Sequence, residues 1–114
     1  MWLHLLYMML TVGSYHTMII DKDVQQLCDS LEINEYLYKK GYNGFETKWT
    51  VREAAEQVVN GKNIIFRVTS HPTDFETGEN SMDLSMCVKI FQNLQQDIEI
   101  TEIRPCASWL DVVD

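Results

Sequence analysis

The chain has 114 residues, of which 46% are hydrophobic and 23% are charged, and its 9 Lys and Arg against 17 Asp and Glu give a formal charge of −8. This length is typical of one domain that buries roughly two-thirds of its unfolded surface, and the composition is that of a globular protein rather than a disordered one. The excess of negative charge argues against a nucleic-acid partner and against adhesion to an anionic membrane, because both need clustered Lys and Arg.

The first residues of the chain form an apolar stretch. Residues 2–12 are apolar except at two positions, which gives the length of the hydrophobic region of a signal peptide and is too short to span a bilayer. The small residues Gly13 and Ser14 follow, as a cleavage site requires, but the basic residues that begin a signal peptide are missing. We expect residues 1–12 to be a signal peptide, with an apolar N-terminal strand as the alternative, and residues 13–114 to form a single domain.

The next segment has the hydrophobic spacing of a helix. Apolar residues recur every three to four positions between residues 20 and 31, with polar residues on the other faces. The pattern predicts one helix of roughly five turns. It should begin near Asp21 and run to Lys39 and Lys40, whose charges stabilise the C-terminal end of the helix dipole, and Gly41 should end it.

Beyond the helix the hydrophobic pattern changes to a period of two. Residues 45–52 alternate between apolar and polar side chains, which predicts a strand with one face in water. Asn60 and Gly61 form a strong hairpin signal, and residues 64–69 alternate again. Residues 70–83 contain Pro, Gly and several acidic side chains and are predicted to be a loop.

The C-terminal third predicts two further strands. Residues 84–90 and 98–100 alternate, and a short turn near Gln95, Gln96 and Asp97 connects them. One long helix followed by four strands in consecutive hairpins indicates an α+β fold, in which the helix covers the apolar face of an antiparallel sheet.

Three cysteines permit at most one disulfide and one free thiol. Cys87 and Cys106 enclose a segment with the pattern of a hairpin, so a bridge between neighbouring strands is feasible and would contribute about 3 kcal/mol in an oxidising compartment. Two reduced, buried cysteines are the alternative, because spacing alone does not establish a pair. Cys28 lies within the predicted helix and is expected to be a small buried hydrophobic residue.

Patterns typical of catalysis are missing. The three histidines have no paired metal-ligand spacing, and the sequence contains neither a CxxC motif nor a glycine-rich phosphate loop. The acidic side chains of residues 70–83 do not match a calcium-binding loop and are expected to be solvated. We predict no metal and no cofactor, and we predict that the protein is not an enzyme; a small α+β enzyme is the weakest alternative.

The most informative segment is Gln57-Val58-Val59-Asn60-Gly61, a hairpin tip with two apolar side chains at or near its end. An ordinary turn whose valines pack into the sheet is the simpler interpretation. The segment also resembles the QxVxG first binding loop of the cystatins, which inhibit papain-like cysteine peptidases. Residues 61–68 (GKNIIFRV) look like the strand that leaves this loop, and residues 86–95 (MCVKIFQNLQ) look like the strand that enters the second binding loop of the family.

The resemblance covers nearly all of the chain from Gly13 to Cys106 and implies a fold. Cystatins consist of one long helix packed on a curved antiparallel sheet, here expected to have four to five strands. The spacing of Cys87 and Cys106 looks like that of the secreted, disulfide-bonded branch. The resemblance therefore implies a disulfide between them and a secreted protein, with a cytoplasmic location as the alternative.

The resemblance also implies a function, which is reversible, competitive inhibition of papain-like, cathepsin-like cysteine peptidases. The N-terminal trunk and two hairpins would form a wedge that fills the active-site cleft without reacting with the catalytic cysteine. Gly61 is expected in an exposed turn, where its missing side chain allows close backbone approach. A monomer is expected, and hairpin exchange could give a domain-swapped dimer. The implied contact residues are Gly13, Gln57, Val58, Val59, Asn60, Gly61, Leu94, Gln95 and Gln96.

The sequence also departs from the family. Gln95 and Gln96 occupy the positions of a Pro-Trp pair that is usual in the second loop, so that loop should contribute less affinity. The first disulfide of the secreted branch is absent, and Ser14 replaces the second glycine of the trunk. The missing Pro-Trp pair, together with the open assignment of residues 1–12, supports the alternative that the chain is a cystatin-fold interaction or structural protein without peptidase inhibition.

Overall fold

The computed structural model describes residues 14–42, 48–70 and 84–109. Four expectations lie outside these residues: the signal peptide or strand of residues 1–12, the trunk residue Gly13, the beginning of the first predicted strand at residues 45–47, and nearly all of the predicted loop at 70–83. Among the described residues, no helix is long and apolar enough to cross a membrane.

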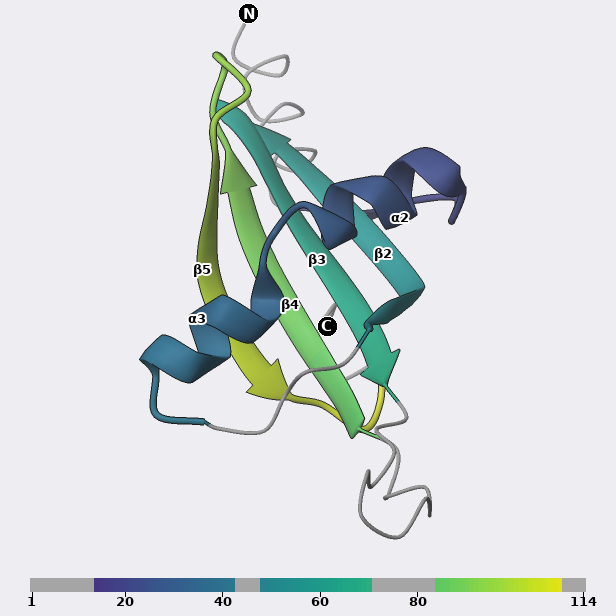
Figure 1. Cartoon of the computed structure of the whole chain (residues 1–114). Helices are drawn as coiled ribbons and strands as arrows, with labels where there is room; N and C mark the ends of the chain where they lie inside the picture. Colours follow the sequence, from purple (N-terminus) through teal and green to yellow (C-terminus); the bar gives the residue numbers. More distant parts are fainter. Residues whose placement is uncertain (1–13, 43–47, 71–83, 110–114) are drawn as a thin grey trace, which may run out of the picture.

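Five strands form one antiparallel sheet in which each strand pairs with its neighbours in the sequence (Figure 1). Two helical segments lie one after the other across a single face of this sheet, so the α+β prediction is confirmed. The sheet has a short first strand that the sequence pattern did not predict. The strands are β1 (His16–Thr17), β2 (Thr50–Val59), β3 (Gly61–Ser70), β4 (Leu84–Gln92) and β5 (Ile98–Pro105).

The helical layer begins and ends where the sequence predicts. Asp21 is the N-cap of α2 (Lys22–Asp29), and its carboxylate accepts a hydrogen bond from the backbone N–H of Val24 at 2.9 Å. At the other end α3 (Ile33–Lys39) is followed by Gly41 with φ +95°, and the N–H of Tyr42 donates to the carbonyl of Leu37 at 3.0 Å. This is the left-handed glycine C-terminus that ends many helices.

The predicted single helix is interrupted between α2 and α3. Glu32 adopts a left-handed backbone with φ 55°, and the hydroxyl of Ser30 donates to the carbonyl of Leu27 at 2.7 Å. The interruption lets Leu31 and Ile33 both turn toward the sheet, with exposed fractions of 9% and 4%. Residues two apart lie on different sides of a continuous helix, so an unbroken helix would leave one of the two in water.

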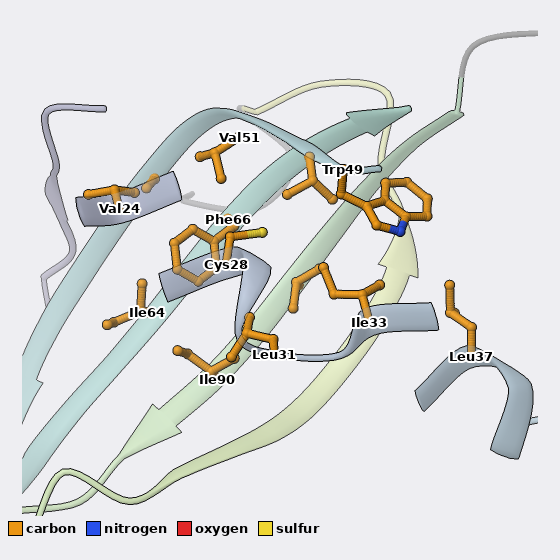
Figure 2. Close-up of a cluster of buried hydrophobic side chains, with 13 residues drawn as sticks. Val24, Cys28, Leu31, Ile33, Leu37, Trp49, Val51, Ile64, Phe66 and Ile90 are labelled. Carbon is orange, nitrogen blue, oxygen red and sulfur yellow. The ribbon is translucent and has the colours of Figure 1, made fainter. Parts of the chain in front are cut away.

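The core lies between the helical layer and the sheet face that it covers (Figure 2). Cys28 is buried within it at 1% exposure, as predicted. Phe66, on the central strand β3, is fully buried beneath the helices. The helical layer contributes Val24, Cys28, Leu31, Ile33 and Leu37, and the sheet side contributes Trp49, Val51, Ala54, Ile64, Phe66, Val68, Val88 and Ile90.

Strand β2 follows the predicted alternation only up to an irregularity. Trp49 and Val51 are buried and Arg52 is exposed, as the period of two predicts, and the register with β3 then shifts between Val51 and Glu53. The outer edge of β2 is covered here by a side chain of α2. The amide of Gln25 donates to the carbonyl of Trp49 at 3.0 Å and accepts from the N–H of Val51 at 2.9 Å. Gln25 therefore takes the place of a neighbouring strand.

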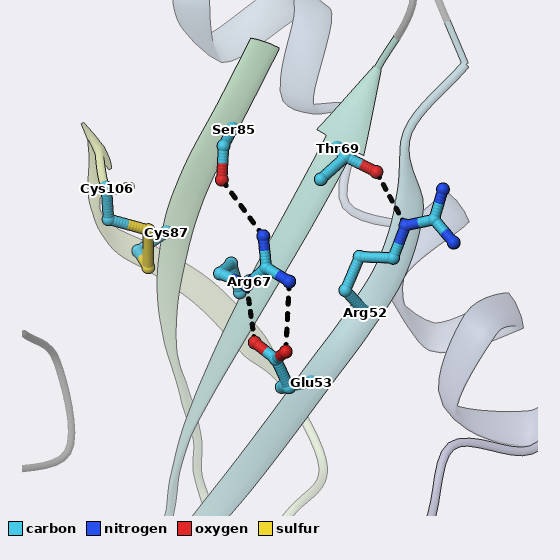
Figure 3. Close-up of polar contacts among 7 residues, drawn as sticks. All are labelled: Arg52, Glu53, Arg67, Thr69, Ser85, Cys87 and Cys106. Carbon is cyan, nitrogen blue, oxygen red and sulfur yellow. Dashed lines mark hydrogen bonds and ion pairs between the residues drawn. A yellow bond between two sulfur atoms is a disulfide. The ribbon is translucent and has the colours of Figure 1, made fainter. Parts of the chain in front are cut away.

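A disulfide joins Cys87 of β4 to Cys106, which directly follows β5 (Figure 3). Their Cα atoms lie 5.7 Å apart, within the usual range for a bridge. The structure thus selects the bridged alternative and confirms the pair that the resemblance implied. Cys28 is a free cysteine.

We expect thiol alkylation to distinguish the three cysteines. Burial, and then the negative charge of Asp29, raise the pKa of the Cys28 thiol to about 12, so the reactive thiolate is scarce at pH 8. Intact-mass measurement should show no rapid modification of the native protein. Unfolding without a reductant should then expose one thiol, and unfolding with a reductant should expose all three. Three modified cysteines without a reductant would contradict the bridge.

The sheet face turned away from the helices carries a partly buried ion pair (Figure 3). Arg67 of β3 binds the carboxylate of Glu53 through two nitrogens, with Nη2 2.9 Å from Oε1. Its Nη1 also donates to the hydroxyl of Ser85 at 3.2 Å. The two-pronged contact joins β2 and β3 more firmly than a single surface ion pair would, and the hydrogen bond to Ser85 links β3 to β4.

Acid should weaken this ion pair. The hydrogen bonds from Arg67 lower the pKa of Glu53 from its ordinary value of 4.5. A lowered pKa in the folded state stabilises the protein above the unfolded-state value and loses that effect as the pH falls through the folded-state value. Urea unfolding from pH 7 to pH 3 should therefore show that Glu53→Gln is less stable than the wild type at pH 7 and that the difference shrinks below about pH 4.5. A difference that stays constant with pH would contradict this assignment.

Candidate functional site

Both long hairpins turn at the same end of the sheet (Figure 1). The β2–β3 hairpin turns at Asn60, and the β4–β5 hairpin turns between Asn93 and Asp97. Because Lys62 at the start of β3 pairs with Gln92 at the end of β4, the two turns are neighbours in space. The topology therefore brings together two of the three segments that the sequence singled out.

The first hairpin is tight, as Asn60-Gly61 predicts. Val59 pairs directly with Gly61, so Asn60 alone joins the two strands. One step further from the tip Val58 pairs with Lys62, and the side chain of Val58 is 55% exposed. The interpretation in which both valines pack into the sheet is therefore wrong for Val58, whereas Val59 is half-buried.

A side-chain hydrogen bond and an ion pair stiffen this hairpin. The amide of Asn63 donates to the side-chain oxygen of Gln57 at 2.7 Å, across a directly opposed pair of residues. Lys62 lies 3.6 Å from Glu56, with both side chains partly exposed. Gln57 thus holds the base of the tip, while Val58 and Asn60 point into solvent.

Gly61 does not lie in an exposed turn, so that expectation is wrong. It is buried, with φ +115°. A Cβ atom at this position would lie 2.5 Å from the carbonyl oxygen of Gln92 and 3.0 Å from Cζ of Phe91. The missing side chain therefore lets β4 approach the first hairpin, which places the second hairpin next to it.

The second hairpin turns where the sequence predicts and presents Leu94. This side chain is 68% exposed, and Gln95 and Gln96 beside it are exposed as well. Gln96 has φ 69°, in the left-handed region. Sequence reasoning missed Asn93, whose side chain accepts hydrogen bonds from the N–H groups of Gln95 at 3.0 Å and Asp97 at 2.9 Å. The available signal was its position at the start of a turn, where Asn forms such bonds frequently.

The chain also enters the sheet near this end. His16 of β1 pairs with Glu56, so Ser14 and Tyr15 lead into β1 from the side of the first hairpin. Gly13, the expected trunk contact, lies outside the described residues.

This end of the sheet exposes apolar side chains at its two hairpins, beside the Lys62–Glu56 ion pair. Three of the seven large hydrophobic side chains exposed among the described residues lie here, namely Val58, Leu94 and Ile98, with exposed fractions of 55%, 68% and 37%. Within the same part of the chain, no group of three or more His, Cys, Asp or Glu side chains has the geometry to hold a metal ion. This surface is suited to inserting apolar side chains into a partner.

The comparisons with known proteins bear on the fold. No protein-family model and no curated protein sequence matches the chain. A structural comparison finds the crystal structure of a salivary cystatin from the soft tick Ornithodoros moubata, with a TM-score of 0.53 and 16% sequence identity over 82% of this chain and 97% of that chain. The chain has a cystatin-like fold.

The cystatin-like fold confirms the architecture that the resemblance implied, with a helical layer on an antiparallel sheet. In this chain the helical layer is interrupted between α2 and α3. In this fold Gln57–Gly61 comprises the end of β2, the turn at Asn60 and the start of β3, and Leu94–Gln96 lies at the turn of the second hairpin.

Proposed function

We propose that the protein is a reversible, competitive inhibitor of papain-like cysteine peptidases. The observation that supports it best is that the Gln57–Gly61 hairpin and the Leu94–Gln96 hairpin are neighbours at one end of the sheet. Each presents an exposed apolar side chain at its tip, Val58 and Leu94 respectively. Two neighbouring hairpin tips that project from one end of the sheet can enter a cleft, which a flat protein surface cannot do.

Inhibition by this end of the sheet needs no chemistry from the inhibitor. The two tips enter the cleft on either side of the catalytic cysteine and exclude substrate. Fully burying an aliphatic side chain such as Val58 or Leu94 contributes about 1.5–3 kcal/mol. Both tips are hydrogen-bonded before binding, so little conformational entropy is lost on association.

The N-terminal trunk completes the proposed wedge. Ser14 and Tyr15 enter the sheet beside the first hairpin, so Gly13 directly before them is proposed to reach the same cleft. We place Gly13 there as the point at which the trunk bends, together with the contacts made by Val59, Asn60, Gln95 and Gln96.

The disulfide supports an oxidising compartment, since such bridges are rare in the cytosol. We therefore propose that the protein is secreted and that residues 1–12 act as its signal peptide. We also propose that it acts as a monomer on cathepsin-like peptidases.

Titration of papain with the purified protein tests this function. We expect inhibition that is reversed by dilution and an apparent inhibition constant that rises with substrate concentration. Papain whose catalytic thiol carries a small methylthio group should still bind, measured by calorimetry, because the wedge does not react with the thiol. Loss of binding when the catalytic thiol is blocked in this way would contradict the mechanism.

A second candidate function is an interaction or structural role without peptidase inhibition. The observation that favours it is the second hairpin, where exposed Gln95 and Gln96 occupy the positions of an apolar pair in the family that the sequence resembles. Failure to inhibit papain or cathepsin-like peptidases at micromolar concentration would favour this role.

A further inference from the structure

The turn of the second hairpin is organised by a single residue, Asn93. Its N–H donates to the carbonyl of Asp97 at 3.0 Å, and its own carbonyl accepts from the N–H of Gln96 at 2.9 Å. Its side-chain oxygen accepts from the N–H of Gln95 at 3.0 Å and of Asp97 at 2.9 Å. Its side-chain amide approaches the Asp97 carboxylate at 3.4 Å. The backbone N–H groups of three consecutive turn residues are thus satisfied by Asn93.

These bonds are needed because the turn contains a strained residue. Gln96 has φ 69°, a conformation that costs a residue other than Gly roughly 1 kcal/mol. The turn keeps this conformation because Asn93 binds the residues before and after it, Gln95 and Asp97. Without the Asn93 side chain, the N–H groups of Gln95 and Asp97 would bond to water instead. The turn would then rearrange and relieve the strain at Gln96.

Leu94 lies within this turn and makes none of its side-chain hydrogen bonds. It is 68% exposed, whereas the core-facing apolar residues of β4, such as Val88 and Ile90, are fully buried. Its direction is therefore determined by the backbone of the turn and not by packing against the sheet.

We propose that Asn93 is a positioning residue that fixes Leu94 as the apolar anchor of the second hairpin. The proposal rests on the proposed function, and it assigns to Leu94 an apolar subsite of the peptidase, because the polar side chains of Gln95 and Gln96 do not supply the apolar contact of the Pro-Trp pair. Asn93 acts through the turn and does not itself touch the partner. An Asp at this position would accept the same two N–H bonds but would place a second carboxylate beside Asp97.

A double-mutant cycle with papain as the probe tests this role. Leu94→Ala and Asn93→Ala should each raise the inhibition constant about tenfold, in the range usual for an interface anchor. The inhibition constant of the double variant should exceed that of Leu94→Ala by no more than about twofold, because residue 94 no longer carries an anchor side chain for Asn93 to position. Asn60→Ala, at the other tip, is the matched control, and its effect should add to that of Leu94→Ala.

A second measurement does not depend on inhibition. Amide hydrogen exchange at Gln95 and Asp97 should accelerate in Asn93→Ala and stay close to the wild type in Asn93→Asp, which should also retain most of the inhibition. Additive losses in the double variant, or unchanged exchange in Asn93→Ala, would overturn the positioning role while leaving the proposed function intact. A wild type that does not inhibit papain would overturn both.

Discussion

Val58→Asp should weaken inhibition of papain about 100-fold, a change of about 3 kcal/mol in binding free energy. Val58 is 55% exposed near the tip of the first hairpin, and the variant would bring a carboxylate into an apolar contact where nothing neutralises it. Stability should change little, because the side chain is exposed and Lys62 lies directly opposite the new charge. Inhibition titration and thermal unfolding measure the two effects separately.

Ile19→Asp is the matched control for this prediction. Ile19 is 86% exposed and follows β1, away from both hairpin turns, so the same kind of substitution removes an exposed aliphatic side chain outside the proposed wedge. It should leave the inhibition constant unchanged. If folded Val58→Asp inhibits as well as the wild type, the first hairpin does not contact the peptidase.

Gly61→Ala should lower the free energy of unfolding by about 3 kcal/mol, and a larger side chain should lower it further. Two effects contribute. The backbone has φ +115°, which L-residues rarely adopt, and the new Cβ would lie 2.5 Å from the carbonyl oxygen of Gln92. Because β4 would be displaced, the second hairpin should also move relative to the first. Denaturant unfolding measures the loss.

Gly41→Ala separates the two effects. Gly41 also has a positive φ, +95°, but a Cβ there would meet nothing within 4 Å. This variant should lose about 1 kcal/mol, the part that comes from the backbone alone. Equal losses in the two variants would show that the approach of Gln92 to Gly61 is unimportant. Gly61 substitutions are consequently poor probes of binding, since reduced inhibition would be mixed with reduced stability.

Local features of the sequence predicted local structure well. The carboxylate of Asp21 begins the helical layer, Gly41 ends it, and Asn60 with Gly61 forms the first turn, because caps and turns depend on residues only a few positions apart. Alternation likewise predicted which side chains of β3 and β4 face the core, since neighbouring side chains of a strand point to opposite faces. The spacing of Cys87 and Cys106 did not establish whether they form a disulfide. The pairing of β4 with β5 brings them close enough to do so.

The helix interruption shows where local reasoning fails. The apolar stripe of α2 continues past the end of the helix to Leu31, and that of α3 starts at Ile33, which is out of phase with it. The change of phase is present in the sequence, but the residues around it favour a helix, so the sequence pattern predicts a continuous helix. Packing decided the outcome, because burying both side chains against one sheet is worth more than the strain of a left-handed Glu32.

By itself the sequence determined the class of fold, the caps and the turns through short-range patterns, and its resemblance to the cystatins indicated the two segments proposed for binding. Only the tertiary structure decided that Gly61 is buried beneath Gln92, that Gln25 covers the edge of β2, and that both hairpin tips share one end of the sheet. These features join residues that are roughly 25 or more positions apart, and the number of turns and bulges between them sets which atoms meet. Hydrophobic spacing carries no information about such contacts. They are determined by the register of the assembled sheet.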